Sequence, residues 1–277
     1  MLGQHVRIEC EDARLEAIVR ANFGAMLTAE GEQPPDLDYL LCAHPGPASF
    51  TLRRAGAPVE SAHQAADLLF LLEKDLVVAL QRRRADLLFL HAAALVHGGR
   101  AYVLAGDSGH GKSTTAWGLL HHGFGYLSDE LAPIDLATLE VLAYPHALCL
   151  KRAPPPEYPL PAQGVLDLQA TLHVSAQSLP QLAAVQARSP LEAVLFVRYR
   201  KDATTPVLRE LGRAETGARL YVASLNALAH HQRGMDAVAR IAAKVTGFTL
   251  DSAGLGDTCN LLHRMATAGR PRPRRGD

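Results

Sequence analysis

The alternation of apolar and polar positions divides the chain into two parts that a long helix joins. In residues 1–60, "HVRIEC", "YLLCAH" and "ASFTLRRAG" are typical of short strands, and "DARLEAIVRANFGAML" has helical spacing with Asp12 near its start. From Ser61, "SAHQAADLLFLLEKDLVVALQRRR" predicts a helix of about six turns. Because its apolar positions cover more than one stripe, we expect this helix to pack on two sides.

The second part begins with "LLFLHAAALVHGGRAYVLAG", which predicts two apolar strands joined by a turn at Gly98 and Gly99. A helix over Lys112–His122, a strand "FGYLSDE" and a hairpin around Asp135–Thr138 are expected to follow. The segment "RAPPPEYPLPAQG" is too rich in proline for regular structure and is expected to be a mobile surface loop. Beyond it the pattern predicts a central strand "LEAVLFVRYR", helices "RAETGARLYVASLN" and "MDAVARIAAKVTG", a strand "FTLDS" and a final helix "LGDTCNLLHRMATA".

These elements predict an α/β protein with a small α+β unit at its N-terminus. We expect that unit and the linking helix to span residues 1–85, and a larger α/β domain to span residues 86–268. Residues 269–277, "GRPRPRRGD", combine proline and arginine without apolar side chains, so they are predicted to be a disordered basic tail.

Composition excludes some classes of function. Lys plus Arg and Asp plus Glu both total 28, so there is no net charge to attract nucleic acid or a membrane surface. The N-terminus lacks the pattern of a signal peptide, and no stretch approaches the roughly 18 uncharged apolar residues of a membrane span. We therefore expect a soluble cytoplasmic protein without nucleic-acid or membrane partners.

Cysteine and histidine residues give no metal-binding pattern. Four cysteines lie far apart, as expected of reduced thiols scattered through a cytosolic protein. His121-His122 and His230-His231 are adjacent pairs, whose side chains would diverge by about 100° on a helix. We interpret them as helix termini.

The chemistry-bearing motif is "GDSGHGKS", which satisfies G-x-x-x-x-G-K-[ST]. It follows a predicted strand and opens a predicted helix, the context that a phosphate-binding loop requires. Lys112 would supply charge to the β- and γ-phosphates of ATP, and Ser113 a hydroxyl ligand to Mg²⁺. His110 occupies a free position of the motif and is expected at the surface rather than in catalysis. The predicted nucleotide-binding residues are Gly106, Asp107, Ser108, Gly109, His110, Gly111, Lys112, Ser113 and Thr114.

Two carboxylates, Asp129 and Glu130, end the strand that follows the predicted phosphate-binding helix. Successive strand residues point to opposite faces, so one could accept a proton while the other helps to hold Mg²⁺. A solvated turn is the alternative interpretation. The later apolar strand ends in Arg198 and Arg200 rather than the metal-binding Asp of a typical P-loop ATPase. This absence argues against a motor or switch NTPase.

Four basic residues are candidates for substrate contacts. Lys151 and Arg152 follow an apolar strand and could clamp a carboxylate or phosphate. Arg198 and Arg200 could stabilise charge in a transition state, and alternation would point both to one face. Exposed strand ends are the alternative in both cases.

Residues 90–135, "LHAAALVHGGRAYVLAGDSGHGKSTTAWGLLHHGFGYLSDELAPID", resemble the HPr kinase/phosphorylase family and, more closely, its shorter HPr-kinase-like relatives. The resemblance rests on His91, on the loop and on the pair Asp129-Glu130, with "YPHALCLK" (144–151) similar as well. It implies a P-loop kinase fold of phosphoenolpyruvate-carboxykinase-like topology and ATP-dependent phosphorylation of a serine hydroxyl. It also implies that Asp129 accepts the proton, that His91 orients or tunes it, and that Lys112 and Ser113 serve the phosphates and Mg²⁺. With Asp129 as the base, Glu130 is the carboxylate expected to help hold Mg²⁺.

The chain departs from the family in two ways. Its acidic pair is Asp-Glu where the family has Asp-Asp, and it lacks the downstream glycine, arginine and asparagine segment associated with HPr docking. HPr is therefore not the expected substrate. Some relatives phosphorylate serine in ribosomally made peptides, including lasso peptides, and others act on free serine.

The expected function is an ATP-dependent kinase for a hydroxyl, of serine in a peptide or protein. The alternatives are a free-serine or small-molecule kinase, a P-loop NTPase or nucleotide-gated regulator, and a nucleotide-binding scaffold without chemistry. Because members of the family often assemble, the resemblance also leaves a homo-oligomer open.

Overall fold

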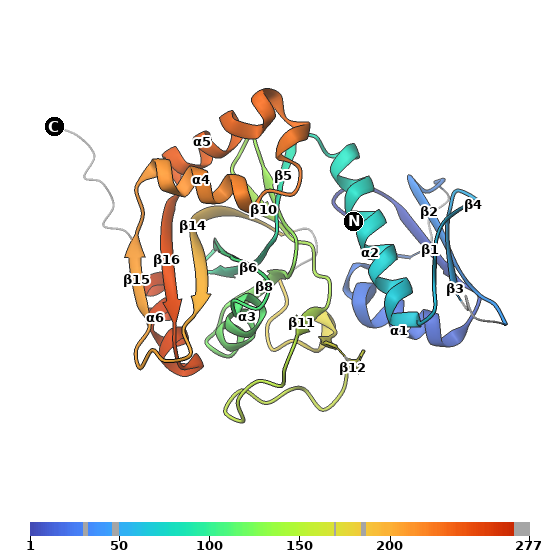
Figure 1. Cartoon of the computed structure of the whole chain (residues 1–277), viewed down its shortest axis with the longest axis horizontal. Coiled ribbons are helices and arrows are strands. Elements are labelled where there is room, and N and C mark those ends of the chain that lie inside the picture. Colours follow the sequence, from blue (N-terminus) through green and yellow to red (C-terminus); the bar gives the residue numbers. More distant parts are fainter. Residues whose placement is uncertain (30–32, 46–49, 169, 184–186, 269–277) are drawn as a thin grey trace.

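A computed structural model describes residues 1–29, 33–45, 50–168, 170–183 and 187–268, so the predicted tail over 269–277 lies outside the described residues. The N-terminal part is a four-stranded sheet of order β1-β2-β3-β4 with two helices. Figure 1 shows α2 standing between this sheet and the rest of the molecule. The elements are β1 (Val6–Cys10), α1 (Ala13–Phe23), η1 (Gly24–Met26), β2 (Leu37–Ala43), β3 (Phe50–Arg54), β4 (Ala57–Ala62) and α2 (Ala65–Arg83).

Local signals account for the start of α1 but not for the start of α2. The Asp12 carboxylate accepts hydrogen bonds from the amides of Arg14 and Leu15, which is the capping that its position predicts. The long helix begins at Ala65 rather than Ser61, because Ala57–Ala62 forms β4, a strand that the sequence pattern did not predict. This strand pairs antiparallel with β3, and most of its residues are exposed, so buried and exposed positions do not alternate along it.

The second part is built on a nine-stranded mixed sheet. Along its main path the order is β5-β9-β10-β14-β7-β6-β8, and β16 pairs with β14 and with β15. The long strand β14 lies at the centre, as predicted, and runs parallel to β7 and β16. The strands are β5 (Leu87–Leu90), β6 (Ala92–His97), β7 (Arg100–Ala105), β8 (Gly125–Ser128), β9 (Ala132–Asp135), β10 (Glu140–Leu142), β14 (Arg188–Tyr199), β15 (Val207–Glu210) and β16 (Thr246–Ser252).

Helices cover both faces of this sheet, and the alternation of apolar residues along β14 sets the layers. Leu195 and Val197 pack with α3 (Lys112–His121) and α6 (Leu255–Thr267), whereas Val194 and Phe196 pack with α4 (Arg213–Ala223) and α5 (Met235–Lys244). The result is a three-layer arrangement within a mixed α/β fold (Figure 1).

One predicted strand is divided in two at His91. The segment before it, β5, pairs with β9, whereas the segment after it, β6, pairs with β7 and β8. Buried Asn226 accepts from the Phe89 amide and donates to the Leu87 carbonyl, both at 2.9 Å. The first segment is therefore held in a different part of the sheet from the second, and His91 stands at the joint.

A small antiparallel sheet of order β11-β13-β12 adjoins α3. Its strands are β11 (Leu148–Leu150), β12 (Val165–Asp167) and β13 (Leu172–Val174); the sequence pattern did not predict the last two. The proline-rich stretch 151–164 has no helix or strand, as expected. It is anchored at Tyr158, whose carbonyl accepts from the Trp117 indole at 2.9 Å and whose hydroxyl lies 3.0 Å from His122 Nε2. Its mobility stays a prediction.

Three short 3₁₀ segments complete the chain: η2 (Ala176–Ser178), η3 (Ala227–Ala229) and η4 (His231–Gly234). The helix α3 ends at His121, and His122 lies just beyond it. His230 follows η3 and His231 is the first residue of η4, so both histidine pairs are found at helix ends, as interpreted from the sequence.

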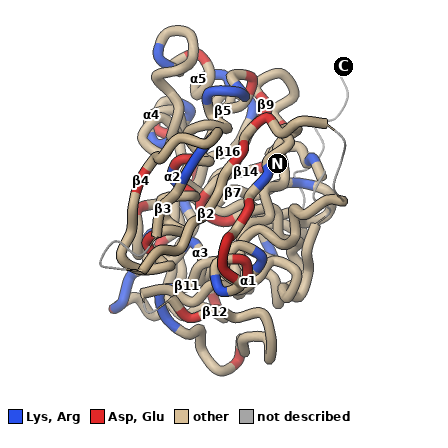
Figure 2. Tube along the Cα trace, turned by 90° about the vertical axis from the view of Figure 1, so that its right-hand side faces the viewer, with Lys and Arg blue, Asp and Glu red and all other residues tan. Residues whose placement is uncertain are grey.

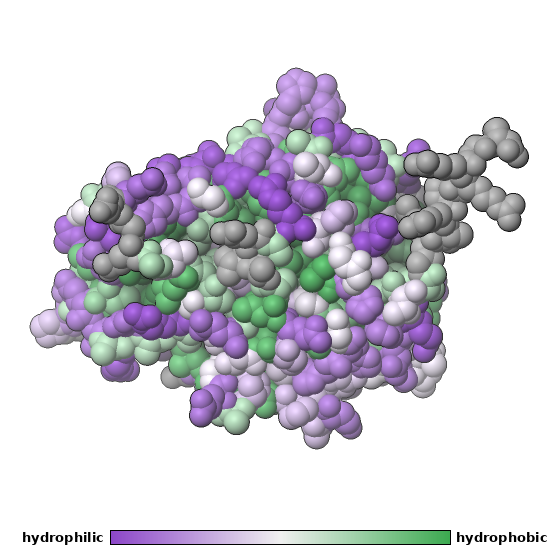
Figure 3. All heavy atoms as spheres, turned by 180° about the vertical axis from the view of Figure 1, so that it is seen from behind, coloured by the Kyte–Doolittle hydropathy of each residue, from purple (hydrophilic) through white to green (hydrophobic). Residues whose placement is uncertain are grey.

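The surface shows no segregation of charge on the side that carries the N-terminal sheet. Basic and acidic segments are interspersed there (Figure 2). In the view from behind, hydrophobic residues gather near the middle of the face and hydrophilic residues around its margin (Figure 3). In the part of the chain that the structure describes, no helix combines the length and the apolar character needed to cross a bilayer.

Candidate functional site

The predicted phosphate-binding loop connects β7 to α3. Its glycines have positive φ angles, 154° at Gly106, 85° at Gly109 and 91° at Gly111, a backbone region that favours glycine. At Gly106 there is a second constraint, because a Cβ atom would lie 2.6 Å from the carbonyl oxygen of Val197 on the adjacent strand. The loop therefore approaches β14 more closely than a side chain would allow.

Two lysines contact the loop. Lys112 is buried, and its Nζ donates to the carbonyl oxygens of Gly106 at 2.9 Å and Asp107 at 3.4 Å. Lys151 comes from the end of β11, and its Nζ donates to the Ser108 hydroxyl at 2.6 Å. Of the two candidate basic residues after β11, the structure thus brings Lys151 to the loop. Its neighbour Arg152 is exposed.

Ser113 and Thr114 lie half-buried in the first turn of α3. The N-terminus of a helix carries a partial positive charge and free backbone N–H groups, which together favour an anion. With the glycine-rich loop in front of it, this end of α3 has the form of a phosphate-binding site.

Asp129 is buried beside this helix end, with 1% of its surface exposed. One carboxylate oxygen, Oδ2, accepts from the Cys149 amide at 3.1 Å, whereas the other, Oδ1, is buried without a hydrogen-bond partner. Burial and the nearby Glu130 carboxylate raise the pKa of Asp129 from 3.8 to about 6, against the opposing effects of Cys149, Ser113 and Lys112. Asp129 can therefore exchange a proton near neutral pH.

Glu130 has a different environment. Its side chain is half-exposed, and its Oε2 lies 2.6 Å from His91 Nε2. The hydrogen bond from His91 lowers the pKa of Glu130, in spite of the opposing effect of desolvation. The two adjacent carboxyl groups thus have pKa values displaced in opposite directions, as expected where one residue handles a proton and the other stays ionised.

The backbone separates the two carboxylates in a way that the sequence analysis did not foresee. The strand β8 ends at Ser128, so neither carboxylate belongs to it. Glu130 has a φ angle of +66°, a left-handed conformation that is costly for a residue with a side chain. This turn, rather than strand alternation, directs Asp129 inward and Glu130 outward. Backbone strain of this kind is concentrated at functional sites.

His91 also differs from its expected place. The resemblance implies that it orients or tunes Asp129, the expected proton acceptor, whereas the structure pairs it with Glu130. Its backbone amide donates to the Ala223 carbonyl at 2.9 Å, which fixes the joint between β5 and β6 against the end of α4.

The donor set at this end of α3 fits Mg²⁺, which prefers oxygen ligands. The unpartnered Oδ1 of Asp129 is a free acceptor, the Ser113 hydroxyl lowers the pKa of that carboxyl group, and Glu130 is ionised nearby. Among the described residues, no group of three or more His, Cys, Asp or Glu side chains could hold a metal ion. An ion bound here would thus need Ser113 and substrate oxygens as further ligands, as is common for Mg²⁺.

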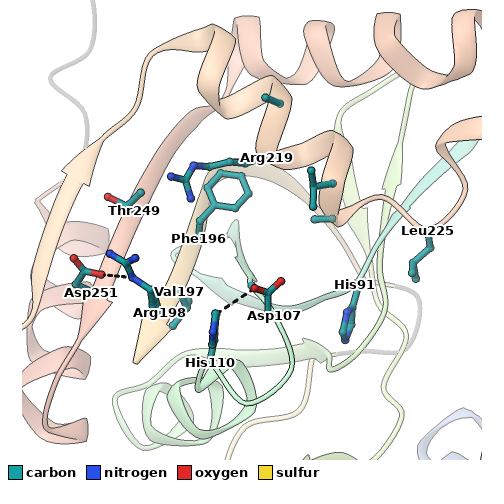
Figure 4. A pocket seen from close by; sticks show the side chains of 14 residues that line it. His91, Asp107, His110, Phe196, Val197, Arg198, Arg219, Leu225, Thr249 and Asp251 are labelled. Carbon is teal, nitrogen blue, oxygen red and sulfur yellow. Dashed lines mark hydrogen bonds and ion pairs between the residues drawn. The ribbon is translucent and has the colours of Figure 1, made fainter. Parts of the chain in front are cut away.

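A cavity of about 590 Å³ opens beside the loop. Figure 4 shows it between the loop residues Asp107 and His110, the strand end at Arg198, and the helix that carries Arg219. The Arg219 guanidinium lies 5.6 Å from the centre of the Phe196 ring, which gives the cavity an aromatic and cationic wall. His110 lines the cavity from the loop side, where its side chain is 37% exposed and its Nδ1 lies 3.8 Å from the Asp107 carboxylate (Figure 4).

The two candidate arginines, Arg198 near the end of β14 and Arg200 just beyond it, share a face, as alternation predicts. The Nε atoms of Arg198 and Arg200 lie 2.9 Å and 3.3 Å from the same oxygen of Asp251 on β16. Their hydrogen bonds lower the pKa of Asp251, with that of Arg198 the largest cause. Arg198 lines the cavity and so places positive charge at the side of the loop remote from Asp129.

Sequence reasoning missed three contributors to this region: the Cys149 amide, Arg219 and Asp251. A backbone amide carries no residue signature, so nothing in the sequence could have identified the first. The pairing of Asp251 with Arg198 follows from the parallel register of β14 and β16, which places these two residues opposite one another. Two adjacent apolar strands with opposite charges at their ends are the signal that could have predicted it.

Comparisons with known proteins give no family assignment. No protein-family profile matches the chain, and no curated protein sequence matches it either. Among solved structures, the chain is similar to the Hpr(Ser) kinase/phosphatase from Coxiella burnetii. The identity is 13%, the match covers 65% of this chain and 88% of that one, and the TM-score is 0.36. A similarity of this size does not place the chain in that family.

Proposed function

We propose that the protein is an ATP-dependent kinase that transfers the γ-phosphoryl group to a hydroxyl, of serine in a peptide or protein. The observation that carries the proposal is Asp129, a buried carboxylate with one unpartnered oxygen and a pKa of about 6, adjacent to a lysine-bearing glycine loop. A general base works best when its pKa lies near the working pH and its free oxygen can reach the proton.

In the proposed reaction, the acceptor oxygen forms a bond to the γ-phosphorus while the bond to the β–γ bridging oxygen breaks and ADP leaves. The hydroxyl proton passes to Oδ1 of Asp129, whose Oδ2 is held by the Cys149 amide. Lys112 neutralises charge on the transferred group. When bound, Mg²⁺ would neutralise further charge and orient the phosphates. The residues that would hold it are Ser113 and Glu130, and His91 keeps the Glu130 carboxylate in place.

The order of the strands suggests how the nucleotide lies. The loop follows β7, with β6 and β8 on one side and β14 and β16 on the other. Since Asp129 follows β8, the γ-phosphate would face that side and the nucleoside would extend toward β14 and β16. The cavity there suits a nucleobase, because Phe196 and Arg219 offer a flat wall and Arg198 a positive charge.

Three exposed apolar side chains in or near the cavity favour a peptide or protein acceptor over a small molecule. Val222 and Leu225 line the cavity but are 81% and 45% exposed, and Leu228, three residues further along, is 75% exposed. Neighbouring apolar residues at the margin of a site are typical of surfaces that contact another polypeptide. A free amino acid would leave them uncovered.

The test is a transfer assay with Mg²⁺ and ATP, in which mass spectrometry detects the addition of one phosphoryl group. The acceptors are serine-containing peptides with apolar flanking residues, the same peptides with alanine in place of serine, and free serine. We expect the serine peptides to be modified and the alanine peptides to remain unmodified. Modification of free serine alone would refute the peptide-kinase proposal and identify a small-molecule kinase instead.

Two variants separate binding from chemistry. Asp129→Asn should bind ATP with nearly unchanged affinity and lose about 100-fold or more of the transfer rate. Lys112→Ala should instead weaken ATP binding itself. The matched control is Glu140→Gln, which alters a carboxylate on β10 of the same sheet. Undiminished transfer by Asp129→Asn would overturn the assignment of the base, and ADP formation at one rate with and without every acceptor would favour an NTPase.

A further inference from the structure

We propose that the N-terminal unit completes the site, because Glu73 of α2, acting through His146, positions the segment 144–149 that holds Asp129. The effect of this support on the reaction rests on the proposed kinase function, whereas the contacts that form it are independent of that function. Glu73 and His146 are positioning residues, since neither touches the reacting groups.

The first contact is between a carboxylate and a buried histidine. Glu73 Oε1 lies 2.7 Å from His146 Nε2, and the His146 side chain is 7% exposed. The other ring nitrogen, Nδ1, lies 3.0 Å from the Ala147 carbonyl oxygen, which can only accept a hydrogen bond. Both ring nitrogens therefore face acceptors, and the imidazole can satisfy both only when it carries two protons.

The electrostatics agree with this geometry. Burial opposes a charge on His146, but the Glu73 carboxylate, the Ala147 carbonyl and Asp129 together outweigh burial and raise the pKa of His146. Tyr144 stacks on the ring, and the edge of Phe23 packs against it with ring centres 4.9 Å apart. The cation is thus enclosed between the N-terminal unit and the segment that follows β10.

A second contact from the N-terminal unit reaches the same segment. Asn22, near the end of α1, is buried; its carbonyl oxygen accepts from the Ala147 amide at 2.9 Å. Its side-chain Oδ1 lies 2.5 Å from Nδ1 of His173, whose strand β13 pairs with β11. Helices α1 and α2 therefore both contribute polar groups to the layer behind the catalytic carboxylate, and Glu73 is the charged one.

The path from this layer to Asp129 is short. The Cys149 amide donates to Asp129 Oδ2, and Cys149 follows His146 by three residues. Tyr126, on β8, donates through its hydroxyl to the His146 carbonyl at 2.8 Å. The segment is thus held on one side by the N-terminal unit and on the other by the strand that leads to the carboxylate. Loosening the Glu73 contact would therefore loosen the hydrogen bond that the Cys149 amide donates to the Asp129 side chain.

Apolar packing also fixes the N-terminal unit against the second part of the chain. Leu68 and Leu72 of α2 share one buried apolar cluster with Leu131, Leu142 and Tyr144 from the second part of the chain. A tethered, independently moving domain would not bury such a core with its neighbour. The N-terminal unit therefore lies in a fixed position relative to the site.

The test compares Glu73→Gln with Asp75→Asn in the full-length protein. Asp75 lies on the same helix, but its carboxylate bonds to Tyr39 and Arg54 of the N-terminal sheet. We expect Glu73→Gln to lower kcat for phosphoryl transfer by at least about tenfold, toward the roughly 100-fold cost of a misplacement of about 1 Å. Its ATP affinity should be unchanged. Asp75→Asn should leave both quantities within about twofold of the wild-type protein.

Two readouts do not depend on the reaction. Imidazole ¹⁵N shifts should show His146 with both nitrogens protonated in the wild-type protein and neutral in Glu73→Gln. Residue-resolved amide exchange of Cys149 should become faster in Glu73→Gln and remain unchanged in Asp75→Asn. Should Glu73→Gln fail to fold, His146→Gln, which keeps a neutral donor opposite Glu73, must show the same loss of kcat and the same faster exchange.

The outcomes are distinguishable. Absence of transfer by the wild-type protein, with the shift and exchange changes present, would refute the kinase function and retain the structural coupling. Unchanged Cys149 exchange and unchanged kcat in Glu73→Gln would overturn the inference, whatever the activity of the wild-type protein. Equal losses in Glu73→Gln and Asp75→Asn would also overturn it, because they would reflect general loosening of the N-terminal unit.

Discussion

Replacing Asp129 with asparagine should make the protein more stable at neutral pH while removing its proposed chemistry. The carboxylate is 1% exposed, and its pKa is raised from 3.8 to about 6, first by burial and then by the Glu130 carboxylate. The folded state therefore prefers the protonated form. The contribution of this carboxyl group to the stability of the folded protein is fully present below pH 3.8 and is lost as the pH rises through about 6.

The size of the effect follows from these two values. At 1.36 kcal/mol for each pH unit, the interval from 3.8 to about 6 corresponds to a cost of about 3 kcal/mol at pH 8 and about half of that at pH 5. Asparagine keeps the shape and an acceptor for the Cys149 amide but carries no charge. Asp129→Asn should thus gain at most about 3 kcal/mol at pH 8, or about 6–12 °C in Tm.

Urea unfolding of the metal-free and nucleotide-free protein, followed by circular dichroism at pH 5 and pH 8, measures this gain. Glu130→Gln is the control of opposite sign: the hydrogen bond from His91 lowers the pKa of Glu130, so removing its charge should reduce stability. A gain for Asp129→Asn that is the same at both pH values, or no gain at pH 8, would refute the reasoning that burial penalises the carboxylate.

Three further predictions follow from the same site. The kcat/KM for phosphoryl transfer should fall as the pH drops through about 6, because the raised pKa of Asp129 leaves the base protonated there; a flat profile between about pH 5 and pH 8 would contradict the assignment. Gly106→Ala should cost about 1–3 kcal/mol in urea unfolding and weaken ATP binding, since its Cβ would lie 2.6 Å from the Val197 carbonyl. Gly109→Ala, where nothing lies within 4 Å of the added atom, should cost less, and an equal loss would refute the contact argument. Lys151→Gln should raise the Kd for ATP at low salt, and the difference in Kd from the wild-type protein should shrink at high salt because the exposed charge is screened. An unchanged Kd at low salt would show that Lys151 does not interact with the phosphates.

The elements that the sequence predicted well are those with a local physical signal. The glycine loop before α3 has positive φ angles at Gly106, Gly109 and Gly111, a backbone region that glycine adopts without a steric cost. Asp12 caps α1 through bonds to its own neighbours. The strong apolar run of β14 indicated a central strand, because strands covered on both faces need apolar residues at nearly every position.

The parts that could not be predicted depend on contacts between distant residues. The strands β4, β12 and β13 are short, and their partners rather than their own alternation hold them in place. The division of one apolar run at His91 arises because Asn226, far along the chain, binds the backbone of β5. The pairing of His91 with Glu130 depends on the left-handed turn at Glu130, which no rule of strand alternation anticipates.

The joint at His91 also limits how this part of the chain can change in evolution. A single residue separates β5 from β6, and each strand is paired in its own part of the sheet. Inserting or deleting one residue there would exchange the inward and outward faces of one strand, because side chains alternate with a period of two. Every residue of β5 is buried, so a shifted strand would find no solvent-facing side to accept the change. Length variation should therefore be tolerated in the stretch 151–164, which has no such register, and absent between Leu90 and Ala92.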